Sequence, residues 1–264
     1  MVSLGLLAAT ANAQWPAWTV VNVAHRGGIV PGYPENTLPA FRRAVSLGVD
    51  AIEIDLRGTR DGEIVIMHDE TINRTTNGKG KVTDYTLEEL KKLDAGGGEK
   101  IPTYGEVLEV VANSGVKLLL DIKVSPQLDK EKVVRLTEKH GAVLDVIAGV
   151  RTLEDLKQFR QLNPNIRTLG FVRSPSNING FIGAGVDIIR LWPKWIEADK
   201  QLVEKVQNRG KPVWTTTTAS RPEELEALIR SGLNGILCNY PETLSKVLSD
   251  MEASKAAARK AAGD

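Results

Sequence analysis

The fold of this chain is decided by residues 50–69, which read DAIEIDLRGTRDGEIVIMHD. In the predicted strand Ala51–Asp55 the two acidic side chains, Glu53 and Asp55, point to one face and the isoleucines point to the other. Two carboxylates on one buried face are costly unless a cation or a basic group compensates them, so the pair favours a divalent metal. An isolated pair with this spacing is more often a solvated edge or a structural salt bridge, so its meaning depends on the rest of the chain.

Short apolar or β-branched runs recur on both sides of this stretch and predict buried strands. They alternate with stretches of helical spacing such as Thr37–Leu47, and Thr86–Leu93 opens with a capping-box pattern. This alternation, without a dinucleotide-binding glycine motif, predicts an α/β fold of the (β/α)8, TIM-barrel type. The predicted strands are Val20–Ala24, Ala51–Asp55, Ile64–Met67, Val116–Ile122, Val143–Ala148, Ile166–Val172, Val186–Leu191, Val213–Thr217 and Gly235–Cys238.

The predicted barrel is distorted, because the chain offers one strand too many. Arg57–Glu63 is too short for a helical crossover and contains the turn pair Asp61-Gly62. We expect the chain to run down outside the second strand, turn there, and rise again through Ile64–Met67. Residues 70–102 form a long excursion between strands, and such connections at one barrel face are usually lids or binding walls.

Composition indicates one globular domain. The chain has 264 residues, of which 42% are hydrophobic and 25% charged, enough for one large domain with a sizeable core. The net charge of +1 gives no general attraction to nucleic acid or to an anionic membrane, so we expect a small-molecule substrate. Cys238 is the single cysteine, which excludes an intramolecular disulfide, and its apolar surroundings indicate a core residue.

The two ends of the chain differ from the predicted domain at residues 14–252. Residues 1–24 carry no charge, and an apolar stretch followed by Ala11-Asn12-Ala13 predicts a signal peptide over residues 1–13, with export to the periplasm or the extracellular space. No Lys or Arg precedes the apolar stretch, which leaves a cytoplasmic location as the alternative. Residues 253–264 are predicted to be a frayed or disordered tail. No apolar stretch approaches the roughly 20 residues that span a bilayer.

Ionisable side chains stand at the ends of several predicted strands. The apolar run LLLDIK ends in Asp121 and Lys123, which share a face, and two other strands end in His25 and His68. Because all strand C-termini of such a barrel open on one face, these groups are expected to converge with the acidic pair. The third histidine, His140, ends a predicted helix and is assigned no role.

Much of the chain closely resembles the glycerophosphodiester phosphodiesterases. The resemblance is strong over residues 20–124 and weaker beyond, where Val213-Trp214-Thr215 and Tyr240-Pro241 match the family's final strands. The segments that carry it are Ala24–Gly28 (AHRGG), Pro34–Phe41 (PENTLPAF), Gly48–Leu56 (GVDAIEIDL), Thr59–Gly62 (TRDG), Val65–Asp69 (VIMHD), Arg74–Thr76 (RTT), Ile101–Thr103 (IPT) and Leu120–Lys123 (LDIK).

The resemblance implies a barrel enzyme that hydrolyses glycerophosphodiesters to sn-glycerol 3-phosphate and an alcohol, as part of lipid and glycerol metabolism, with one divalent cation, Ca²⁺ or Mg²⁺. A cation can neutralise a phosphoryl oxygen, and an imidazole can serve as general base or general acid near neutral pH. The implied residues are Glu53, Asp55 and Asp121 for the metal, His25 and His68 for acid–base catalysis, and Arg26, Lys123 and Trp214 for phosphate or substrate binding.

The chain also departs from the family. Asp121 stands where the family more often has Glu, Trp214-Thr215-Thr216-Thr217 replaces a WTVN-like segment, and Asn239 replaces the Asp that usually precedes the final Tyr-Pro. The alternatives are a sphingomyelinase D-like or phosphoinositide-cleaving enzyme on a related barrel, and a non-catalytic binder of phosphodiester head groups. A glycosidase that uses two carboxylates gives no reason for the histidine pair or for Arg26. Head group, choice of cation, the role of each histidine and oligomeric state stay open.

Overall fold

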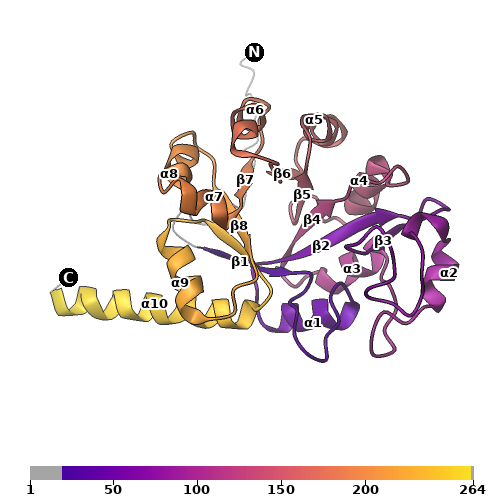
Figure 1. The fold of residues 1–264 in the computed structure, drawn as a ribbon, viewed down its shortest axis with the longest axis horizontal. Helices are drawn as coiled ribbons and strands as arrows, with labels where there is room; N and C mark the ends of the chain where they lie inside the picture. The colour runs from indigo at the N-terminus through magenta and orange to yellow at the C-terminus, as the bar shows by residue number, and fades with distance from the viewer. Residues whose placement is uncertain (1–19, 263–264) are drawn as a thin grey trace, which may run out of the picture.

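The computed structural model describes residues 20–262 and contains one nine-stranded sheet. Eight strands are parallel, and pairing of β1 with β2 closes them into a barrel, with helices arranged around the outside (Figure 1). The predicted TIM-type fold is therefore confirmed. The strands are β1 Val21–His25, β2 Ala51–Gly58, β3 Ile64–Ile66, β4 Lys117–Ile122, β5 Val146–Val150, β6 Arg167–Gly170, β7 Ile188–Leu191, β8 Val213–Thr217 and β9 Gly235–Cys238.

Side-chain caps define the start of several helices. Thr86 and Thr103 each accept a hydrogen bond from the backbone three residues on and complete a capping box, at α2 and α3. Two helices that the sequence did not reveal, α6 and α7, are only six residues long and show too little periodicity to be found. The helices are α1 Leu38–Ser46, α2 Leu87–Lys92, α3 Tyr104–Val111, α4 Lys130–Lys139, α5 Leu153–Leu162, α6 Ile178–Gly183, α7 Pro193–Ala198, α8 Leu202–Gln207, α9 Pro222–Arg230 and α10 Pro241–Ala262, with 3₁₀ turns η1 Val82–Asp84 and η2 Pro175–Asn177.

The strands carry two apolar faces. Alternate residues point outward and join the helices in the main core, while the others fill the barrel interior. Position along a strand therefore tells which side chains can reach the mouth of the barrel, the end at which the parallel strands terminate. The interior core consists of Val21, Val23, Ala51, Leu119, Ile147, Leu169, Phe171, Ile188, Trp214 and Leu237.

The path expected for the extra strand was wrong. β3 pairs antiparallel with the end of β2, so that Leu56 lies opposite Ile66 and Gly58 lies opposite Ile64. β2 continues upward to Gly58, turns, and returns as a hairpin, because no descending segment separates the two strands. Position 58 requires glycine, because a Cβ there would lie 2.1 Å from the carbonyl oxygen of Gln127.

The long excursion at residues 70–102 forms a small unit beside the barrel, together with β3. It contains η1 and α2, seen at the edge of Figure 1, and has its own apolar cluster around Ile72, Val82 and Leu90. This cluster also includes Val65 and Met67 of the hairpin, which fixes the segment that carries His68.

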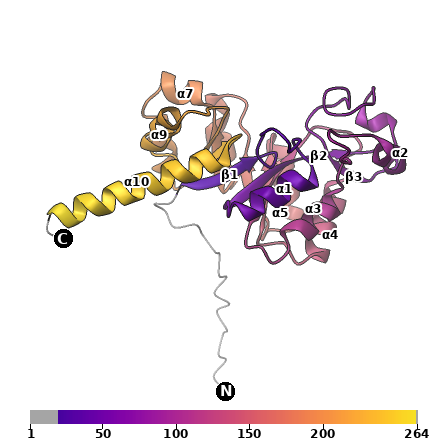
Figure 2. The ribbon, with the colours of Figure 1, turned by 90° about the horizontal axis from the view of Figure 1, so that it is seen from below.

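The ends of the described chain lie apart from the mouth. Helix α10 packs through Leu244 and Val247, and its last turns are exposed and project beyond the barrel (Figure 2). The predicted tail at residues 253–264 is thus helical as far as Ala262, and the predicted signal peptide lies outside the described residues. None of the helices within residues 20–262 combines the length and the apolar composition that are needed to span a bilayer.

Candidate active site

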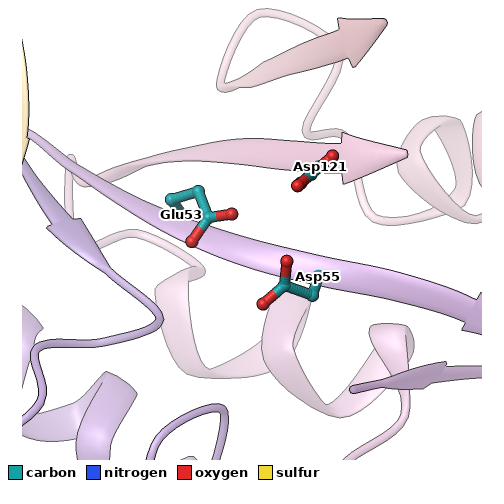
Figure 3. Close-up of side chains that lie close together, drawn as sticks. All are labelled: Glu53, Asp55 and Asp121. Atoms are coloured by element: carbon teal, nitrogen blue, oxygen red, sulfur yellow. The ribbon is translucent and has the colours of Figure 1, made fainter. Parts of the chain in front are cut away.

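Three buried carboxylates lie together on β2 and β4. Asp55 is paired in register with Asp121, and Glu53 precedes Asp55 by two residues on the same inward face. One carboxylate oxygen from each lies within 4.8 Å of the others, and Figure 3 shows the three side chains gathered close together at β2 and β4. The side chains are only 2%, 0% and 4% exposed, in sequence order, so water provides little compensation for their charge.

Two basic side chains hold Asp121. The ammonium of Lys123 lies 2.5 Å from Oδ2 of Asp121 and 2.7 Å from Oδ1 of Asp55. Arg151 donates from Nε and Nη2 to Oδ1 of Asp121 (3.1 and 2.8 Å) and from Nη2 to Oδ2 (2.6 Å). Burial alone would raise the pKa of Asp121, but the positive charges of Lys123 and Arg151 hold it below its usual value.

Glu53 remains incompletely neutralised. Burial and the nearby charges of Asp55 and Asp121 raise its pKa well above the usual value. A carboxylate in that condition gains most from an added cation, and oxygen donors are the ligands that hard divalent cations prefer. The three residues therefore fit a divalent metal, which would be held by the oxygens of Glu53, Asp55 and Asp121.

The loop after β1 orients these oxygens. The backbone amide of Arg26 donates to Oε2 of Glu53 (3.0 Å), and Nδ2 of Asn36 donates to Oδ2 of Asp55 (2.8 Å). Arg26 and Asn36 both have left-handed φ angles, of 55° and 58°, so the loop accepts backbone strain in order to place these donors.

His25 ends β1 beside Glu53, its partner in register. Its Nδ1 hydrogen-bonds to Oδ1 of Asn239 (2.6 Å), and its Nε2 lies 3.9 Å from Oε2 of Glu53. If Nδ1 carries the proton of this bond, the lone pair of Nε2 faces the carboxylates. Burial, followed by the charge of Arg26, lowers the pKa of His25 to about 4, so the ring is neutral over most of the physiological range.

His68 lies at the same mouth but has a different partner. Its Nδ1 is 2.7 Å from Oδ1 of Asp69, and Arg74 donates from Nε to Oδ2 of Asp69 (2.6 Å). Arg74 also donates two hydrogen bonds to Glu35, which in turn accepts one from Nη1 of Arg26 (2.9 Å). The hydrogen bond from Arg74 and the one from His68 keep the pKa of Asp69 well below its usual value. A continuous chain of charge-assisted bonds thus connects the His68 side of the mouth to Arg26.

The predicted residues fall into two groups. Glu53, Asp55, Asp121, Lys123, Arg26 and His25 form one connected cluster, and His68 joins them through the Asp69–Arg74–Glu35 connection. Trp214, in contrast, is 1% exposed and belongs to the interior core, packed against the backbone of Gly235. It forms the floor beneath the site, and its part in substrate binding stays a prediction.

The sequence did not single out two arginines of this mouth. Arg151 follows β5, which ends at Val150 and not at the expected Ala148, so the residue did not stand at the end of the predicted strand. Arg190 is the one charged residue in the four-residue strand β7 and is 3% exposed. Arg190 could have been found from the sequence, because a single charged residue inside an apolar strand is rarely buried without a role.

Comparisons with known proteins agree with this geometry. Residues 25–243 match the model of the glycerophosphoryl diester phosphodiesterase family. A glycerophosphodiester phosphodiesterase of Caldanaerobacter subterraneus is 34% identical over 234 residues, which cover 84% of this chain and 95% of that protein. One of Bacillus subtilis is 30% identical over 259 residues, covering 86% of each chain.

Solved structures give the same result. A glycerophosphoryl diester phosphodiesterase from Parabacteroides distasonis superposes with a TM-score of 0.77 at 28% identity, covering 90% of this chain and 89% of that one. A phosphodiesterase from Oleispira antarctica, solved in complex with the product sn-glycerol-3-phosphate, gives a TM-score of 0.78 at 25% identity, covering 88% and 98%. The resemblance noted in the sequence is therefore confirmed, and this chain belongs to the glycerophosphoryl diester phosphodiesterase family.

Proposed function

We propose that the protein hydrolyses glycerophosphodiesters to sn-glycerol 3-phosphate and an alcohol, using one divalent cation and the two histidines of the barrel mouth. The observation that carries the proposal is the buried carboxylate cluster of Glu53, Asp55 and Asp121, with an imidazole of His25 beside it. Membership of the family makes the protein a phosphoric diester hydrolase, and the relatives named above support glycerophosphodiesters as its substrates.

The cation, Ca²⁺ or Mg²⁺, would supply a positive charge for an anionic phosphoryl oxygen. The basic side chains of this protein add further positive charge. Lys123 lies among the carboxylates, and Nε of Arg26 lies 3.6 Å from Oδ2 of Asp55. A guanidinium and an ammonium both stabilise the charge that builds up on the phosphoryl group during cleavage.

The different partners of the two imidazoles support a different role for each. Asn239 is neutral, and when its Oδ1 accepts the proton of Nδ1, His25 presents the lone pair of Nε2 to the site and can act as the general base. Asp69 is a carboxylate and offsets the charge of an imidazolium, so His68 can act as the general acid that protonates the departing alkoxide. The nucleophile is water, or a glycerol hydroxyl that first gives a cyclic phosphate; either one transfers its proton to His25.

The decisive assay measures sn-glycerol 3-phosphate released from glycerophosphocholine and glycerophosphoethanolamine. We expect activity that EDTA abolishes and that Ca²⁺ or Mg²⁺ restores. His25→Ala and His68→Ala should lower turnover by roughly 10²- to 10⁴-fold. His140→Ala is the matched control, because His140 caps the C-terminus of α4 and its imidazole bonds to the carbonyl of Leu136.

A second substrate separates the roles of the histidines. The p-nitrophenyl diester of glycerol 3-phosphate has a leaving group that needs no proton, so His68→Ala should recover much of its activity on it, whereas His25→Ala should not. Equal defects on both substrates would contradict the assignment.

Product analysis tests the alternatives. Cleavage of sphingomyelin to a ceramide phosphate, or of a phosphoinositide to an inositol phosphate, without release of glycerol 3-phosphate from the glycerophosphodiesters would favour a sphingomyelinase D-like or phosphoinositide-cleaving enzyme. Binding of the diesters without turnover would indicate a head-group binder. Export, which the N-terminal sequence favours, is also part of the proposal, and fractionation of cells that produce the full chain tests it.

A further inference from the structure

Arg190 is a buried cation without an acidic partner. Its side chain is 3% exposed, and no carboxylate of residues 20–262 lies within ion-pair distance of it. Its Nε and Nη1 make no hydrogen bond within the described part of the chain. Burial, and then the charge of Arg151, lowers its pKa to about 10, which still leaves the guanidinium charged at neutral pH. Buried donors without a hydrogen-bond partner lower the stability of the folded state, and in native proteins they usually bind a ligand or a water molecule.

The position of Arg190 brings this cation to the active site. Ile188 belongs to the interior core, and Arg190, two residues further along β7, points to the same side. In the closed strand order β7 lies opposite β2, so Arg190 lies across the barrel from the strand that carries Glu53 and Asp55. The proposed mechanism does not use it.

Two aromatic rings and a second guanidinium complete this part of the mouth. The Cζ atoms of Arg190 and Arg151 each lie 5.0 Å from the centroid of Phe171, so one ring contacts both cations. Trp192 stacks on Arg190 at 3.6 Å. The contacts of Arg151 with Asp121 use Nε and Nη2, which leaves its Nη1 edge for another group. We call these four residues the β5–β7 wall.

We propose that the β5–β7 wall binds an anionic group, a carboxylate or a phosphate, on the alcohol portion of the substrate. The inference rests on the proposed function and names the substrate class that this mouth prefers. The diester phosphate belongs beside the histidines and the carboxylate cluster, so a second anion on the same molecule reaches the opposite wall. Guanidinium groups suit either anion, because both accept two parallel hydrogen bonds.

The indole of Trp192 covers the binding position and has space to leave it. Trp192 is 38% exposed, and a groove of about 660 Å³ lies beside it, lined also by Ile196 of α7 and Leu228 of α9. Movement of the indole into this groove uncovers the guanidinium of Arg190. Anion binding then replaces a cation–π contact by a charge-assisted pair, which is the stronger interaction.

Aromatic rings also suggest the opposite preference, for a quaternary ammonium such as choline. Such ligands bind the open faces of Trp, Tyr or Phe. Here Arg190 stacks on Trp192, and Phe171 already contacts two cations. An additional positive charge would be repelled, so glycerophosphocholine should be a poorer substrate than an anionic diester.

The test compares substrates that differ by one anionic group. Glycerophosphoserine and glycerophosphoethanolamine differ by a carboxylate, and glycerophosphoinositol 4-phosphate and glycerophosphoinositol differ by a phosphate. We expect kcat/KM of the wild-type protein to be about 10-fold or more higher for the anionic member of at least one pair. The pair that shows the larger ratio identifies the anion.

Variants connect this ratio to the wall. Arg190→Gln and Arg190→Met should bring the ratio close to one, and Arg190→Lys should give an intermediate value, since an ammonium keeps the charge without the paired donors. Arg135→Gln is the matched control, because Arg135 lies on α4 with 60% of its side chain exposed and should leave the ratio unchanged.

Several results would overturn the inference. A wild-type ratio near or below one for both pairs would do so even if the Arg190 variants fail to fold. Equal losses on charged and uncharged members in Arg190→Gln would assign this arginine to the diester phosphate. Failure of the wild-type protein to hydrolyse any of the four compounds would instead refute the proposed function, and this inference with it.

Discussion

Replacing Asp69 by Asn tests how the fold prepares His68. The carboxylate accepts from Nδ1 of His68 at 2.7 Å and from Arg74 at 2.6 Å, so it fixes the ring and leaves Nε2 for the substrate. An amide of the same shape keeps the packing but loses the negative charge that offsets an imidazolium. The change therefore isolates electrostatics from geometry.

The exposure of the pair sets the size of the effect. Hydrogen bonds to charged groups contribute about 1.5–3 kcal/mol, and the lower end applies because the side chains of His68 and Asp69 are 35% and 29% exposed. A loss of about 1.5 kcal/mol in the transition state lowers kcat roughly 10-fold at nearly constant KM. Stability should fall by less than about 1 kcal/mol, because Arg74 keeps its bonds to Glu35.

The assay is steady-state release of glycerol 3-phosphate, with thermal unfolding measured on the same samples. Glu70→Gln is the control, because this neighbouring carboxylate is exposed and pairs with Lys81, not with a histidine. The p-nitrophenyl diester should show little or no defect in Asp69→Asn. A kcat within twofold of wild type on glycerophosphoethanolamine, or an equal defect on both substrates, would refute the role given to Asp69.

Two further predictions concern His25 and the barrel rim. Asn239→Asp places a carboxylate beside His25 and raises the pKa of His25 above about 4. Because the general base must be neutral, the acid limb of the kcat/KM–pH profile should move to higher pH. An unmoved limb would count against His25 as the base. Gly58→Ala should destabilise the protein by about 1–3 kcal/mol in denaturant unfolding, because its Cβ meets the backbone of Gln127 at 2.1 Å. Gly105→Ala, in α3 with its nearest neighbour at 4.0 Å, should be neutral or slightly stabilising, and equal losses in both variants would contradict the steric explanation.

The sequence was sufficient for the barrel and for the carboxylate cluster because both follow from local periodicity. A period of two puts Glu53 and Asp55 on one face, and parallel closure places the end of β4 beside them. No long-range information beyond the fold class is needed for this convergence. The cluster of Glu53, Asp55 and Asp121 was therefore accessible from three short stretches of sequence.

Other features depend on where a strand stops, which periodicity defines poorly. The expected end of β5 at Ala148 hid Arg151, which donates three hydrogen bonds to Asp121. The wrong path for β3 has the same origin: β2 was expected to end at Asp55 but continues to Gly58, and only that extension makes a direct hairpin possible. The partners of the imidazoles, Asn239 and Asp69, depend on side-chain contacts that sequence spacing does not encode.

The extension of β2 also explains why His68 arrives at a site built from parallel strands. An antiparallel strand that began at the rim would deliver its last residues to the bottom of the barrel. Because β2 extends past Asp55 before it turns, β3 starts above the mouth and descends to it, and the amide of Met67 bonds to the carbonyl of Asp55 at 2.9 Å. His68 follows directly. The alternation of side chains along β2 therefore positions two carboxylates, and the length of β2 positions the imidazole of His68. Changing the length of β2 should displace His68 while leaving the carboxylate cluster in place.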